Sequence, residues 1–116
     1  MERFFYSKLA EINIPRSIEY IASHAFDFCI FLKSVKFEEG CQSIGDKCFC
    51  ECASLSTVIL PASLEYIGEE AFKNCYNLTE LYYKGTLEEF RNRFNINNII
   101  KGSGIRSIHC SDGDVA

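Results

Sequence analysis

The sequence predicts a β-rich solenoid in which a short unit occurs three times and is followed by a C-terminal cap. Three observations lead to this prediction. Apolar residues recur every 23 residues, each interval contains two short extended segments, and the last part of the chain leaves this spacing. A unit of this size cannot bury its own apolar side, whereas stacked units bury it against one another. We therefore expect residues 1–116 to form a single domain.

The repeat emerges when residues 14–36, 37–59 and 60–82 are aligned without gaps. Leu9 and Ile12 extend two of the resulting columns backwards, so residues 1–13 are predicted to be a partial repeat. Several matched columns at one spacing indicate a true internal repeat. The five columns are Ile21, Ile44 and Ile67; Phe26, Phe49 and Phe72; Cys29, Cys52 and Cys75; Leu32, Leu55 and Leu78; and Val35, Val58 and Leu81.

Each block contains two predicted strands. The runs at 32–37, 55–60 and 78–83 follow the pattern L-x-x-V-x-F, whose alternation is typical of a half-buried strand. A second extended segment is predicted at S-I-E-Y-I and its equivalents, before Gly45 and Gly68, where the chain must turn. The A-F-x-x-C segment is too short for a stable helix, which favours a tight or 3₁₀-like turn.

Residues 84–116 depart from the repeat and are predicted to form the cap, with one short helix. Thr86 and Glu89 have the spacing of a capping box at a helix start. Phe90 and Phe94 are four residues apart and would pack on the last repeat. The chain is then expected to break, extend and turn at Gly102 and Gly104, 105–110, and Asp112-Gly113.

The third block, LPASLEYIGEEAFKNCYNLTELYY, resembles the pattern LPxSLxxIGxxAFxxCxxLxxVxF of the BspA-type leucine-rich repeat, also called the Treponema pallidum type. The first block is similar, whereas the second departs from the pattern, with Cys48 for the alanine before the phenylalanine. The resemblance covers residues 9–83, and residues 84–116 look like the segment that often closes bacterial members. It implies a fold formally grouped with the α/β horseshoes. It also implies a non-enzymatic protein-interaction module, with adhesion or host-surface binding as its role.

The outward positions of the predicted L-x-x-V-x-F strands are the candidate binding surface. An exposed Ile59 beside Tyr82, flanked by charges, has the mixed aromatic and charged character of a small binding patch. The alternative is that these residues are an ordinary surface on one sheet face. The partner would be a protein or a surface glycan. The candidate residues are Asn13, Ser34, Lys36, Thr57, Ile59, Glu80 and Tyr82.

The seven cysteines include the run KCFCEC at residues 47–52. The 23-residue register places Cys41 and Cys48 in buried columns and leaves Cys50 as a predicted exposed thiol. The C-x-C-x-C spacing lacks the paired arrangement of zinc sites, and buried reduced thiols are the expected state. We therefore expect no metal, no cofactor and no catalytic residue. The rival hypothesis is a small metal or redox protein that uses Cys50 or the His109-Cys110 pair.

The composition restricts the partners further. A net charge of −4 and a pI near 5.2 argue against nucleic acid. The sequence contains neither a signal-peptide pattern nor an apolar run of about 20 residues, so membrane insertion is not expected. Taken literally, the chain is cytoplasmic, whereas the family resemblance implies the cell surface if it is a fragment. A further alternative is a weak homo-oligomer that stacks through its N-terminal end, where Phe4, Phe5 and Tyr6 lie.

Overall fold

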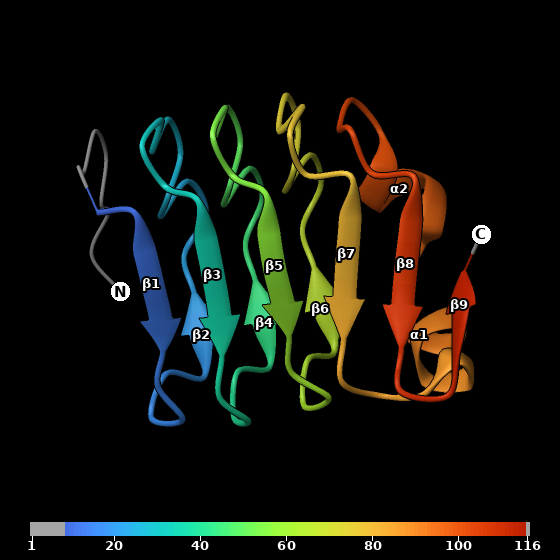
Figure 1. Ribbon diagram of the computed structural model, residues 1–116. Helices are drawn as coiled ribbons and strands as arrows, with labels where there is room; N and C mark the ends of the chain where they lie inside the picture. The colour runs from blue at the N-terminus through green and yellow to red at the C-terminus, as the bar shows by residue number, and fades with distance from the viewer. Residues whose placement is uncertain (1–8, 116) are drawn as a thin grey trace.

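The computed structural model describes residues 9–115, and its main element is a six-stranded sheet (Figure 1). Four parallel strands of four residues each come from the repeat: β1 (Glu11–Ile14), β3 (Ser34–Phe37), β5 (Thr57–Leu60) and β7 (Glu80–Tyr83). They begin two residues after the leucines that opened the predicted runs. Neighbouring strands pair in register one repeat apart, as in Asn13 with Lys36 and Lys36 with Ile59. The 23-residue period is therefore the offset between paired strands.

A second parallel sheet lies behind the first in Figure 1. It contains β2 (Tyr20–Ile21), β4 (Ser43–Ile44) and β6 (Tyr66–Ile67), the three predicted second segments. Its register is again one repeat, with Ile21 opposite Ile44 and Ile44 opposite Ile67.

The five apolar columns form the core between the two sheets. Every member of the five columns is buried. The rings of Phe26 and Phe49 stack with centroids 5.2 Å apart, and those of Phe49 and Phe72 with centroids 5.7 Å apart. Leu9 is the exception to the predicted extension, because half of its surface is exposed. It precedes β1 and does not continue the buried leucine column.

The A-F-x-x-C segments are tight turns, as predicted. Bonds from residue i+3 to residue i, such as the Cys29 N–H to the Phe26 carbonyl (3.2 Å), alternate with bonds to the next block. The Phe26 N–H donates to the Cys48 carbonyl (2.8 Å), and the Phe49 N–H to the Ala71 carbonyl (2.9 Å). This pattern needs a left-handed residue at the start of each turn, supplied by His24, Lys47 and Glu70 with φ of 64°, 53° and 56°. The turns therefore link the blocks as a third ladder.

The close approach of neighbouring blocks explains why a glycine follows β4 and β6. A Cβ at Gly45 would lie 2.4 Å from the Ser23 nitrogen, and one at Gly68 would lie 2.4 Å from the Asp46 nitrogen. A side chain at either position would push neighbouring blocks apart.

The cap contains two helices, so the prediction of a single helix was wrong. Helix α1 (Leu87–Arg93) has the predicted capping box: the Glu89 N–H donates to the Thr86 hydroxyl (3.1 Å). Phe94 is extended and ends α1. A second helix, α2 (Ile96–Ile100), then starts because the Asn95 side chain accepts from the Asn98 N–H (3.1 Å). Several asparagines lie close together in this segment, so the sequence did not single out Asn95 as a helix cap.

After the helices the chain returns to the large sheet. Strand β8 (Ser107–Cys110) pairs parallel to β7, shorter than the predicted 105–110. Strand β9 (Gly113–Val115), which was not predicted, pairs antiparallel to β8 across the turn at Asp112. Phe90 and Phe94 pack edge-on against Tyr83, as their spacing predicted. Phe4, Phe5 and Tyr6, at the N-terminal end where stacking was predicted, lie outside the described residues.

Candidate functional site: the outer face of the large sheet

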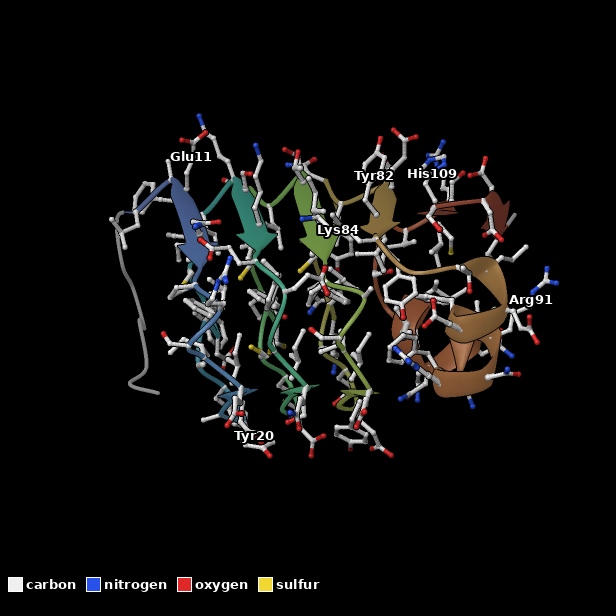
Figure 2. The ribbon with its side chains drawn as sticks, turned by 90° about the horizontal axis from the view of Figure 1, so that it is seen from below. Glu11, Tyr20, Tyr82, Lys84, Arg91 and His109 are labelled. Atoms are coloured by element: carbon white, nitrogen blue, oxygen red, sulfur yellow. The ribbon has the colours of Figure 1, made fainter. Side chains whose placement is uncertain are left out.

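The predicted binding residues all lie on the outer face of the six-stranded sheet. Strands β3, β5 and β7 alternate exposed or half-exposed residues with buried ones. Figure 2 shows Glu11 and Tyr82 on one side of the molecule and Tyr20, from the smaller sheet, on the opposite side. Lys36 and Tyr82 are exposed, whereas Ile59 is only half-exposed rather than fully exposed as predicted. We call this surface the sheet face.

Two rows of side chains cross the sheet face. In the inner row, Glu11 pairs with Ser34 and Ser34 with Thr57, and on β7 and β8 the row continues with the paired Glu80 and Ser107. The outer row is continuous over all six strands, and each of its members pairs with the next. The outer row is Asn13, Lys36, Ile59, Tyr82, His109 and Asp114.

The sequence did not place His109 and Asp114 on this face. His109 follows Tyr82 by 27 residues, so it falls outside the 23-residue register. The remaining signal was the alternation around Ile108, whose burial turns Ser107 and His109 outward. The cap therefore extends the face beyond the repeats.

His109 is the centre of a polar cluster at the cap end of the face. Its Nε2 lies 2.9 Å from a carboxylate oxygen of Glu80, and its Nδ1 lies 2.9 Å from one of Asp114. The Tyr82 ring stacks on the imidazole with centroids 5.0 Å apart. A neutral imidazole has one N–H, so only the protonated ring can donate to both carboxylates. Asp114 and then Glu80 accordingly raise the pKa of His109 above its usual range.

This cluster does not resemble a metal centre. The imidazole lies between the two carboxylates and directs one nitrogen at each. The three groups therefore do not converge on a common point that an ion could occupy. Across residues 9–115, no group of three or more histidine, cysteine or acidic side chains is arranged to hold a metal ion.

The opposite end of the sheet face differs in shape and charge. A hollow of about 230 Å³ is lined by side chains of β1 and β3, namely Glu11, Ile12, Asn13, Ser34 and Lys36. The Asn13 amide there donates to a Glu38 carboxylate oxygen (3.0 Å). This end offers the Lys36 ammonium, the Glu11 carboxylate and the Ser34 hydroxyl beside the apolar Ile12, which suits polar contacts with a partner.

Cys50 is buried, which corrects the prediction of an exposed thiol. It aligned with Asp27 and Lys73, which resembled surface residues. It lies instead in the turn ladder, where its carbonyl accepts from the Phe28 N–H (2.9 Å) and only 7% of its surface is exposed. Burial, with the Asp27 and Glu51 carboxylates, raises the pKa of Cys50 to about 11. The thiol is therefore protonated and a poor nucleophile near neutral pH.

The three-cysteine column is structural. The Cys52 thiol donates to the Phe26 carbonyl (3.1 Å) and the Cys75 thiol to the Phe49 carbonyl (2.9 Å). The neighbouring Cys75 thiol and burial raise the pKa of Cys52. All six cysteines from Cys29 to Cys75 are buried, and Cys110 is half-buried. The thiols of the three-cysteine column therefore pack in the core.

Comparison with known proteins identifies the repeat. The sequence model described as BspA type Leucine rich repeat region matches residues 1–111 in six copies. Three full repeats and a partial one remain our prediction of the repeat count. The searches of curated proteins and of solved structures found no match. In the described part of the chain, no helix has the length and apolar character needed to cross a bilayer.

Proposed function

Because the chain belongs to the BspA-type leucine-rich repeat family, we propose that it is a non-enzymatic interaction module and that its ligand binds the sheet face. Members of this family serve as interaction domains, so the family supports an interaction role in general. The finer proposal is adhesion: the sheet face holds a protein displayed on another cell or host surface, and the chain works at the surface of its own cell.

The continuous outer row is the observation that carries this proposal. Tyr82 supplies an exposed aromatic ring at its centre, with 41% of its surface accessible, and Ile59 supplies an apolar neighbour on the adjacent strand. Lys36 lies on one side of this pair and His109 on the other. Aromatic and apolar anchors within a polar rim are typical of protein-binding surfaces. Parallel strands hold these side chains rigidly, which lowers the entropy cost of binding.

A binding screen followed by substitutions tests the proposal. The chain, linked into a tetramer to gain avidity, would be offered to an array of purified surface and matrix proteins and, in parallel, to a glycan array. We expect a protein ligand whose affinity falls about tenfold with Tyr82→Ala or Ile59→Ser. The matched control is Tyr20→Ala, an exposed tyrosine on the smaller sheet.

Each outcome has a defined meaning. Unchanged binding by a folded Tyr82→Ala protein would contradict the assignment of the sheet face. Equal losses from Tyr82→Ala and Tyr20→Ala would do the same. Binding to glycans alone would replace the protein ligand with a carbohydrate, and the same variants would then show whether the sheet face binds it.

An assembly unit is the second candidate, and one observation favours it. The first block exposes Phe28, Ile30 and Phe31 by 38%, 42% and 50%, in a turn that is more polar in the other blocks. Exposed apolar clusters of this kind often mark contacts between chains. Light scattering at rising protein concentration tests this candidate, and a strict monomer would remove it.

A further inference from the structure

Within residues 9–115, the smaller sheet ends at β6 with two backbone carbonyls that accept no hydrogen bond from a backbone N–H. In the first two blocks, the equivalent carbonyls accept from the next block. The Glu19 carbonyl accepts from the Gln42 N–H (2.7 Å), and the Ile44 carbonyl accepts from the Gly68 N–H (2.8 Å). The equivalent carbonyls in the third block are those of Glu65 and Ile67. Among the described residues, no backbone N–H donates to either, and β6 pairs only with β4.

The cap covers only the beginning of this edge. Arg93, at the end of α1, donates from one guanidinium nitrogen to the carbonyls of Ala62 (2.6 Å) and Leu64 (3.2 Å). Its other terminal nitrogen pairs with Glu89 (3.2 Å). The arginine thus satisfies two carbonyls just before β6, and it makes no hydrogen bond to the two carbonyls beyond them. The carbonyls of Glu65 and Ile67 therefore have no hydrogen-bond donor among residues 9–115.

A cavity lies beside the open edge, between β6 and the cap helices that follow it in Figure 1. Its volume is about 190 Å³. Ile67, Phe94 and Ile99 supply apolar walls, and the polar lining includes Asn95 and Asn98. The Asn95 side chain is used to cap α2, whereas the Asn98 side-chain amide has no hydrogen bond within residues 9–115. Space and a free amide therefore adjoin the unpaired backbone.

We propose that the outer edge of β6 binds an extended peptide segment of a partner protein, which adds to the smaller sheet as a fourth parallel strand. Carbonyls two residues apart match the N–H groups of alternate residues in an extended chain. Between these two donors, the peptide directs an apolar side chain toward Ile67, Phe94 and Ile99. This site lies on a different sheet from the sheet face, so it does not depend on the function proposed above.

A peptide with the sequence of residues 63–68, SLEYIG, blocked at both ends, is the probe. This segment already pairs in the required way, since the Tyr66 N–H donates to the Gln42 carbonyl (3.2 Å) and the Gly68 N–H to the Ile44 carbonyl. We expect millimolar to submillimolar binding, followed by NMR, with shifts at Ile67, Gly68 and Asn98. Absence of shifts at millimolar peptide would overturn the proposal, as would shifts confined to the sheet face.

Methylation of single peptide nitrogens tests the backbone contact without altering the protein. A methyl on the glycine nitrogen removes the donor for the Ile67 carbonyl, as the Gly68 N–H is the donor for Ile44 (2.8 Å), and we expect a loss of about tenfold in affinity. A methyl on the isoleucine nitrogen is the matched control, because that N–H points away from β6. It should change affinity by no more than about twofold. Equal losses from the two methyl groups would contradict strand addition.

Substitutions on α2 test the cavity. Asn98→Trp fills it while keeping the backbone N–H that bonds to Asn95, and we expect peptide affinity to fall at least about tenfold. Asn97→Trp on the same helix is the control, since Asn97 is exposed and does not line the cavity. Equal affinity for the two variants would place the peptide elsewhere. Circular dichroism and thermal melting would establish that both variants fold.

Discussion

The cap treats the two sheets differently. On the large sheet, β7 gains a parallel neighbour, β8, and the sheet then ends in the antiparallel β9. On the smaller sheet, β6 gains no strand, and the segment that follows β7 is helical. The large sheet is thus lengthened by the cap, and the smaller one is cut short. Each end carries a proposed site: the extended sheet face and the open edge of β6.

The local sequence explains this difference. If the smaller sheet had a fourth strand, the residue equivalent to Tyr66 would be Glu89, 23 residues later. Glu89 instead completes the capping box with Thr86 and lies inside α1. The segment from Leu87 to Arg93 is rich in good helix formers, so the strand position is lost locally. Ser107, Ile108 and His109 then restore strand alternation beside β7. The capping box at Thr86 therefore ends the smaller sheet, and the alternation of buried and outward residues at 107–109 continues the large one.

Removal of the aromatic packing beneath the cap has the largest expected effect. Phe90 is fully buried, with its ring centroid 5.3 Å from that of Tyr83 and 4.9 Å from that of Phe94. Phe90→Ala should lower the free energy of unfolding by about 3–5 kcal/mol, measured by urea denaturation. Asn92→Ala, on the exposed side of α1, should change it by less than about 0.5 kcal/mol. A loss below about 1 kcal/mol from Phe90→Ala would show that this packing does not fix the cap to β7.

Removal of the arginine at the start of the open edge should have a smaller effect. Arg93→Met keeps an apolar stem but leaves the carbonyls of Ala62 and Leu64 without their donor. We expect the free energy of unfolding to fall by about 1–3 kcal/mol. Arg91→Met, in the same helix turn and exposed, is the matched control and should cost less than about 0.5 kcal/mol. Equal losses would mean that the arginine does not support this sheet edge.

A pH titration provides the mildest test, at the other sheet. Glu80 of β7 and Asp114 of β9 face His109 of β8 and raise its pKa, so the folded chain holds this proton more tightly than the unfolded chain. The resulting stability is fully present below the unfolded pKa of about 6.5 and is lost as the pH rises through the higher folded pKa. His109→Gln should abolish this part of the pH dependence, measured by unfolding from about pH 6 to pH 8. If raising the pH instead stabilised the wild-type chain relative to the variant, folding would not raise the pKa of His109, and this prediction would be wrong.

The repeat could be predicted from sequence because each column holds the same or similar apolar residues at a fixed spacing. Phe26, Phe49 and Phe72 are buried together for that reason. The seven predicted residues of the sheet face share a face because period-two alternation decides orientation. Cys50 was misplaced because its column holds unlike residues, whose burial depends on the turn ladder. His109 and the edge of β6 were missed because the cap has its own spacing, and pairing there depends on tertiary contacts.

Amide hydrogen exchange tests the difference between the two sheet ends most directly. The Gly68 N–H donates to Ile44, and the Lys84 N–H donates to Leu60, so alternation directs the Ile67 N–H to the open edge and the Leu81 N–H toward β8. Both residues have buried side chains, so the contrast isolates hydrogen bonding. We predict exchange at Leu81 slower than at Ile67 by about a hundredfold or more. Equal protection of the two amides would contradict the open edge of β6.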